Sequence, residues 1–146
     1  MSLNVRQFRD LIERILREVD PRWLSEDAVE LLLGTAAVES GFGTHLRQVG
    51  GGPALGAFQI EKVTFNDLRE RYGHDYILEH HWHGECEWNL RVSIIFARLK
   101  YWSIPKRLPP ADSVEAMADY WKTWYNTPAG AGTVEKFIEK YHQYAG

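Results

Sequence analysis

The chain has 146 residues, 45% of them apolar and 25% charged, and a formal net charge of −3 at pH 7. This composition is that of a soluble globular domain. It excludes the strongly basic character of proteins that bind nucleic acid or anionic membranes nonspecifically. We therefore expect a single domain, residues 1–146, that acts as a monomer without membrane insertion. Because Cys86 is the one cysteine of the sequence, no internal disulfide can form.

Targeting signals are not evident in the sequence. The first twenty residues mix charged and apolar side chains without an uninterrupted apolar segment, so we predict no signal peptide. The longest apolar runs, Leu31–Leu33 and Ile94–Ala97, are far shorter than the roughly 18 residues needed to cross a bilayer. We expect synthesis in the cytoplasm as a soluble protein.

Two helices are predicted at the start of the chain. Apolar residues recur at three- and four-residue spacing over Val5–Val19, which indicates an amphipathic helix. Asp20-Pro21 should end this helix, because the residue before a proline avoids helical geometry. Ser25 can cap a second helix that ends at Ser40-Gly41. This second helix is apolar on nearly all sides, so we expect it at the centre of the fold.

The remainder of the chain predicts further helices and one glycine-rich insertion. Residues 41–60 lack helical periodicity, and we predict turns or a small β-hairpin that pairs Leu46–Val49 with Ala57–Ile60. Capping residues and apolar periodicity predict helices over residues 64–72, 88–101, 112–124 and 133–144, with capping boxes at Thr64/Asp67 and Asp112/Glu115. Residues 75–86 are ambiguous, 106–110 form a loop, and 127–132 break the chain before its last helix. The predicted fold is all-α dominated, with about seven helices.

Glu39 is the first candidate for chemistry. It closes the apolar run Leu31–Val38 at the C-terminal end of the second predicted helix. The helix dipole at that end and desolvation by apolar neighbours both disfavour a charged carboxylate. Cleavage of a glycosidic bond needs a carboxylic acid that is still protonated near neutral pH. Glu39 therefore suits a proton donor, and the alternative is a glutamate exposed at a helix end.

Three short motifs occur in order along the chain. They are Glu39-Ser40-Gly41-Phe42-Gly43, then Gly56-Ala57-Phe58-Gln59-Ile60, then Trp124-Tyr125-Asn126-Thr127 followed by Gly130 and Gly132. In order and spacing they resemble the Glu-Ser, Gly-Leu-Met-Gln-Ile-like and Ala-Tyr-Asn-x-Gly-like motifs of lytic transglycosylases and goose-type lysozymes. The resemblance covers much of the chain. It implies a lysozyme-like fold and cleavage of the β-1,4 bond between N-acetylmuramic acid and N-acetylglucosamine in peptidoglycan.

The resemblance also implies roles for individual residues. Glu39 would be the general acid and afterwards the base, and Ser40 would orient it or contact the substrate. The hydroxyl of Tyr125 would approach Glu39, with Asn126 beside it, while Trp124 is expected in the core. The sugar groove would be lined by residues of the second motif, namely Gly56, Phe58, Gln59 and Ile60.

This chain departs from the family pattern at several positions. Ala57-Phe58 stands where Leu-Met is usual, and Pro128-Ala129 separates the third motif from Gly130. Glu61 stands where goose-type lysozymes have an aspartate, and it is the candidate for holding a hydrolytic water; its alternative is a solvent-facing glutamate. Their other water-holding aspartate would fall in Gly50–Gly52, where no carboxylate is present. Without a water-activating base, the muramyl 6-hydroxyl attacks C1 and leaves a 1,6-anhydro product, which we favour over hydrolysis.

Other functions remain as alternatives. The segment Glu79–Glu87 contains His80, His81, His83 and Cys86, but their spacing matches none of the usual zinc sites. We expect no metal and no cofactor, a small buried Cys86, and Trp82 and Trp88 packed inward. A second hypothesis is a non-catalytic sugar-binding module with the same fold. A third is a metal-dependent protein that uses His80, His81, His83 and Cys86. The leading prediction is a muramidase that acts on peptidoglycan glycan strands. It resembles phage or prophage endolysins, which reach the cell wall through a holin or within a virion.

Overall fold

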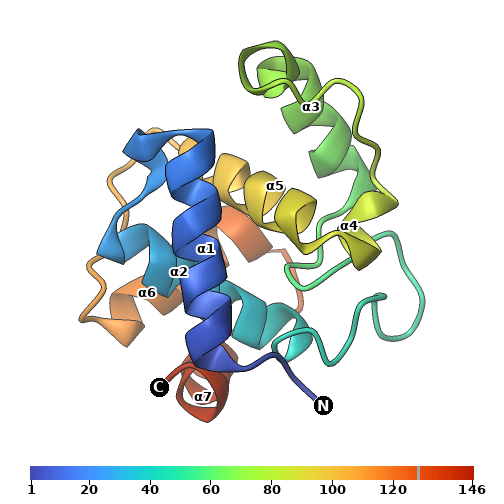
Figure 1. Cartoon of the computed structure of the whole chain (residues 1–146). Helices are drawn as coiled ribbons and strands as arrows, with labels where there is room; N and C mark the ends of the chain where they lie inside the picture. Colours follow the sequence, from blue (N-terminus) through green and yellow to red (C-terminus); the bar gives the residue numbers. More distant parts are fainter. Residues whose placement is uncertain (128) are drawn as a thin grey trace.

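The computed structural model describes residues 1–127 and 129–146, and its fold is helix-dominated, as predicted (Figure 1). The helices in chain order are α1 (Val5–Val19), α2 (Glu26–Ser40), α3 (Lys62–Tyr76), α4 (Glu85–Trp88), α5 (Leu90–Trp102), α6 (Val114–Tyr120) and α7 (Val134–Tyr144). A short 3₁₀ helix, η1 (Pro21–Trp23), follows α1, and a π-helix, η2 (Trp121–Asn126), continues α6. None of the helices in these residues is both long and apolar enough to cross a membrane.

Helix α2 lies at the centre of the fold, as its apolar sequence predicts. The hydroxyl of Ser25 caps its first turn by accepting a hydrogen bond from the N–H of Ala28 at 3.0 Å. Gly41 ends the helix in the left-handed conformation, with φ of +59°. Helix α7 packs directly against α2. The ring of Phe137 comes so close to Gly34 that a Cβ atom there would lie only 2.4 Å from it. Residues 28–37 of α2 are all buried, so the core surrounds the helix on every side.

The predicted β-hairpin is not present in the glycine-rich insertion. Two isolated antiparallel bridges form instead, one between Arg47 and Leu55 and one between Leu55 and Ile60. The N–H of Leu55 and the carbonyl oxygen of Ile60 are 3.0 Å apart, and their reciprocal bond is 2.9 Å. Residues 56–59 form the turn between them, with positive φ at Gly56 and at Gln59. A segment that turns in this way cannot serve as the second strand of the predicted hairpin.

Three helix starts differ from the prediction. Trp88 ends the short helix α4, and α5 begins at Leu90 with Asn89 as its N-cap residue. Helix α3 begins at Lys62 with Glu61 as its N-cap residue, and the Glu61 side chain makes no capping hydrogen bond. Helix α6 begins after Ser113, whose hydroxyl accepts from Ala116 N–H at 3.1 Å, so Asp112 does not cap it. The second half of the predicted 112–124 helix is the π-helix. Pro128, in the predicted break that follows, lies outside the described residues.

The prediction that Trp82 and Trp88 pack inward is wrong. Their side chains are 57% and 66% exposed, whereas Cys86 between them is buried as expected. Most of residues 77–84 form turns rather than a helix, so no helical face carries Trp82 into the core. Its ring packs over Gly84 instead, where a Cβ atom would lie 1.9 Å from it.

Candidate active site

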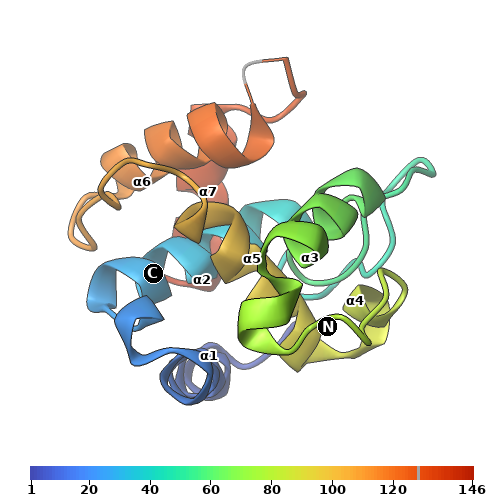
Figure 2. The ribbon, with the colours of Figure 1, turned by 90° about the horizontal axis from the view of Figure 1, so that it is seen from above.

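A polar cavity of about 440 Å³ lies beside the end of α2. The loop after α2 contributes to its wall and extends beyond the helices when the molecule is seen from above (Figure 2), and residues 130–132 contribute as well. Its charged lining residues are Glu39, Glu61 and Lys100. Further lining residues include His45, Gln48, Gln59, Tyr125, Asn126 and Gly130. Three segments that are far apart in the sequence thus meet at Glu39.

Glu39 has the protonation behaviour expected of a general acid. Its side chain is largely withdrawn from solvent, and this burial raises the pKa of the carboxyl from an ordinary value of 4.5 to about 7. The negative charge of Glu61 also raises this pKa, whereas the hydrogen bond from Trp121 and the positive charge of Lys100 lower it. A substantial fraction of Glu39 therefore carries a proton at neutral pH.

Trp121 fixes which oxygen of Glu39 can carry that proton. The indole Nε1–H of Trp121 donates to Oε2 of Glu39 at 2.9 Å. An indole N–H can only donate, so Oε2 acts as the acceptor. The acidic proton therefore belongs on Oε1. Trp121 is the first residue of the π-helix, and single π-turns often occur at functional sites.

Ser40 connects the first motif to the second and does not line the cavity. It is buried, and its Oγ donates to the carbonyl oxygen of Ala57 at 2.6 Å. The same oxygen accepts the N–H of Gly43 at 2.8 Å. These bonds fix the glycine-rich loop to the end of α2. Ser40 is not among the residues that line the cavity, and these bonds make it a support for the loop that borders Glu39.

The second motif contributes one predicted residue to the cavity wall. Gln59 lines the cavity, whereas Phe58 and Ile60 are buried in the core. Gly56 has φ of +87°, and a Cβ atom there would lie 2.0 Å from the carbonyl oxygen of Cys86. Only glycine tolerates both the positive φ and the close approach of this carbonyl oxygen. The motif therefore shapes the turn behind the cavity, and Gln59 alone of the four predicted groove residues faces it.

The third motif meets the second through Tyr125. The buried hydroxyl of Tyr125 donates to the carbonyl oxygen of Phe58 at 2.6 Å, so its hydrogen bond goes to the backbone and not to Glu39. Asn126 lines the cavity, and its Oδ1 accepts from Lys122 Nζ at 2.8 Å. Trp124 packs partly buried against the core, as expected. The sequence thus identified the segment that meets Glu39, but Trp121 supplies the contact that we predicted for Tyr125.

Lys100 is a charged cavity residue that sequence reasoning missed. Its Nζ donates to the carbonyl oxygen of Tyr125 at 2.8 Å and lies 4.0 Å from the centroid of the Tyr125 ring. Burial lowers the pKa of the ammonium, while the charges of Glu39 and Glu61 raise it. Two cations, Arg98 and Lys100, interrupt the otherwise apolar stretch 94–101, and this was the signal available in the sequence.

Glu61, the N-cap residue of α3, also lines the cavity. It is exposed at the start of α3 and makes no side-chain hydrogen bond among residues 1–127 and 129–146. Next to it, Nε2 of His83 lies 2.7 Å from the carbonyl oxygen of Ile60, and Nδ1 of His81 pairs with Glu85 at 3.0 Å. In the described part of the chain, no three His, Cys, Asp or Glu side chains are grouped as metal ligands.

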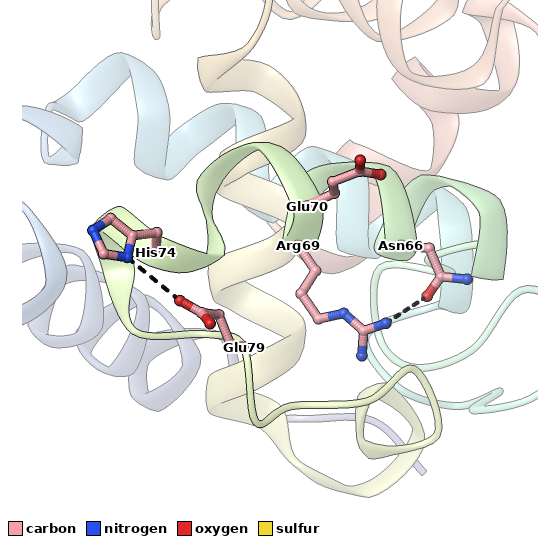
Figure 3. A pocket seen from close by; sticks show the side chains of 5 residues that line it. All are labelled: Asn66, Arg69, Glu70, His74 and Glu79. Carbon is pink, nitrogen blue, oxygen red and sulfur yellow. Dashed lines mark hydrogen bonds and ion pairs between the residues drawn. The ribbon is translucent and has the colours of Figure 1, made fainter.

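A second hollow of about 840 Å³ lies along one side of α3 (Figure 3). His74 and Glu79 face each other there at 3.6 Å, and Arg69 reaches Asn66 at 3.5 Å, while Glu70 points away from these four. His74 and Glu79 are largely exposed, so the hollow provides no desolvated acid. The cavity at Glu39 is therefore the better candidate for catalysis.

Comparison with protein-family models, with curated proteins and with solved structures finds no match to this chain.

Proposed function

We propose that this chain is a peptidoglycan-cleaving muramidase with a lysozyme-like fold and with Glu39 as its general acid. The observation that carries the proposal is the carboxyl group of Glu39, which has a pKa of about 7 and lines a polar cavity. One of its two oxygens accepts a hydrogen bond from Trp121. A general acid works best when its pKa lies near the working pH. The bond to be cleaved is the β-1,4 bond between N-acetylmuramic acid and N-acetylglucosamine.

The reaction needs one proton transfer in each direction. The proton on Oε1 of Glu39 passes to the glycosidic oxygen as its bond to C1 of the muramyl residue breaks, and positive charge develops at C1. The carboxylate left on Glu39 then accepts a proton from the group that attacks C1. If that group is the muramyl 6-hydroxyl, the product is a 1,6-anhydro sugar, and if it is water, the product is a reducing sugar.

We propose the 1,6-anhydro product. Of the carboxylates that line the cavity within the described residues, Glu61 is the sole companion of Glu39. It is exposed and makes no side-chain hydrogen bond that would fix it. A base that activates water must be held within reach of both the water and the sugar. An attacking hydroxyl that belongs to the substrate removes this requirement, so Glu39 serves as acid and base in turn.

Mass spectrometry of the products released from purified peptidoglycan tests this function. Wild type, Glu39→Gln and the exposed control Glu70→Gln are compared at pH 6 and pH 7. We expect anhydro-muramyl ends from wild type and from the control, and none from Glu39→Gln. Reducing muramyl ends, one water heavier, would establish a hydrolase and give Glu61 a part in the reaction. An active, folded Glu39→Gln variant would refute the assignment, and no release by wild type would favour a sugar-binding module.

A further inference from the structure

A second buried cation lies on the opposite face of α5 from Lys100. Arg98 and Trp102 are one turn apart on this face, whereas Lys100, two residues from Arg98, points to the other side. The Arg98 side chain belongs to a residue that is only 4% exposed. Its Nε donates to the carbonyl oxygen of Trp23 at 3.0 Å, and its guanidinium carbon lies 5.6 Å from the centroid of the Trp102 ring.

The charge of Arg98 has no carboxylate partner within ion-pair distance among the described residues. The carboxylate of Asp20 acts on it from further away, but Arg22 binds that carboxylate at 2.7 Å and Tyr76 binds it at 2.8 Å. A guanidinium has five N–H donors, and among the described residues the Nε–H alone has a protein acceptor, the carbonyl oxygen of Trp23. Burial also lowers the pKa of Arg98 to about 10. The two Nη groups are not among the fully buried atoms that lack a partner, so they keep contact with solvent. An anion at this surface could therefore supply acceptors to a charge that is otherwise largely withdrawn from water.

A cavity of about 230 Å³ lies next to Arg98 and can hold such acceptors. It is lined by Arg98, Tyr101, Trp102, Ile104, Lys106 and Leu108, which include two cations and no carboxylate. Lys106 is exposed and makes no ion pair within the part of the chain that the structure describes. Its carbonyl oxygen accepts from the hydroxyl of Tyr120 at 3.2 Å, which ties this segment to α6.

We propose that Arg98 and Lys106 form a binding site for a phosphate group in the cavity between the end of α5 and residues 104–108. Two positive charges without an acid match a dianionic phosphate better than a monovalent carboxylate. The planar guanidinium can donate two parallel N–H bonds to phosphate oxygens, and the lysine adds a point charge. This site is separate from Glu39 and does not depend on the proposed muramidase function.

The first test measures inorganic phosphate binding to the whole chain by ¹H–¹⁵N NMR at constant ionic strength. The indole resonance of Trp102, identified with Trp102→Phe, reports on the cavity itself. We expect this resonance to shift saturably with phosphate and to shift less with acetate at the same concentration. No saturable shift up to tens of millimolar phosphate, or a stronger response to acetate, would overturn the proposal.

Variants of the two cations locate the binding. Lys106→Gln changes an exposed side chain, so it should fold normally and weaken phosphate binding by about tenfold. Lys136→Gln, an exposed lysine on α7, is the matched control and should bind as wild type does. Arg98→Lys keeps a charge but loses the fork of donors, and should bind more weakly still. Equal phosphate affinity in Lys106→Gln and wild type would refute the site. Glucose 6-phosphate shows whether the natural ligand is free phosphate or a phosphorylated molecule. Tighter binding than inorganic phosphate indicates a phosphoryl group on a larger molecule, and weaker binding indicates the free ion. Either result supports the site.

Discussion

Replacing Glu39 with glutamine should stabilise the folded chain at alkaline pH. The pKa of Glu39 is raised in the folded state, so the folded protein binds more protons than the unfolded protein between about pH 4.5 and pH 7. The contribution of Glu39 to the unfolding free energy is therefore complete below its pKa in the unfolded chain. It is lost as pH rises through its pKa in the folded chain. Glutamine cannot ionise and avoids this loss. Its amide oxygen can still accept the Trp121 N–H.

The size of the effect follows from the two pKa values. The difference between 4.5 and about 7 corresponds to roughly 3 kcal/mol at about 1.4 kcal/mol for each pKa unit. This is an upper value, because the Glu39 side chain keeps some contact with solvent. For a domain of this length, such a gain corresponds to a melting temperature higher by roughly 5–10 °C.

Urea denaturation at intervals from pH 4 to pH 9 measures the effect for wild type, Glu39→Gln and Glu70→Gln. The unfolding free energy of Glu39→Gln, relative to wild type, should rise with pH and level off above about pH 8. The exposed Glu70 provides the control, and its variant should follow wild type at every pH. A difference between Glu39→Gln and wild type that does not change with pH would mean that the carboxyl is well solvated when ionised. The physical basis for Glu39 as a neutral-pH acid would then be lost.

Three further substitutions test contacts around the site and the turn behind it. Trp121→Phe removes the donor that favours ionised Glu39, so the alkaline limb of the kcat/KM profile on peptidoglycan should move up by about one pH unit. A profile identical to that of wild type would contradict the role of this N–H. Lys100→Met removes a positive charge and should also raise the Glu39 pKa, which ¹³C NMR of the carboxyl detects without an activity assay; an unchanged or lower pKa would contradict it. Gly56→Ala, which places a Cβ against a backbone carbonyl, should destabilise the chain by more than about 2 kcal/mol in urea. Gly50→Ala has a similar φ in open space and should cost only about 1 kcal/mol.

Local signals in the sequence predicted most of the helices. The Ser25 hydroxyl caps the start of α2, and Gly41 ends it because glycine takes a left-handed backbone conformation without strain. The apolar pattern of α2 predicted its central position correctly. The hairpin failed because its expected second strand contains a turn, in which Gln59 takes the positive φ that glycine usually takes. Trp82 and Trp88 were misplaced because aromatic residues were assumed to fill the core, whereas turns carry Trp82 to the surface. Tertiary contacts decide both cases, and neither is visible in residue spacing.

The candidate site was predicted in part, for a similar reason. Glu39 could be found because its position on the helix and its apolar neighbours are local features. Its hydrogen-bond partner could not be found, because the packing of α6 and η2 against α2 decides which aromatic side chain reaches it. Tyr125 lies four residues further on and bonds to Phe58 instead. Motif matching therefore located a segment that lines the cavity with Glu39, but the hydrogen bond to Glu39 comes from Trp121, which precedes the motif.

Glu30 shows what a buried charge looks like when its role is structural. It is buried in α2 and forms an ion pair with Arg9 of α1. Its other oxygen accepts from the hydroxyl of Tyr141 of α7 at 2.7 Å. Both carboxylate oxygens are thus satisfied by the protein, and Glu30 lines none of the cavities described above. A charge paired in this way holds three helices together and leaves nothing for a ligand to bind.

The two cations of α5, Arg98 and Lys100, face opposite sides of the helix. Unlike Glu30, neither is fully paired by the protein groups that the structure describes. Lys100 and Arg98 each donate to one backbone carbonyl and one aromatic ring, and neither has a carboxylate within ion-pair distance in the described chain. Each also lines a cavity. Desolvation is costly for both, and stability alone would favour an apolar residue or a full ion pair at such positions. Incomplete pairing beside a cavity is therefore the observation that links Lys100 to the proposed chemistry at Glu39 and Arg98 to the proposed phosphate site.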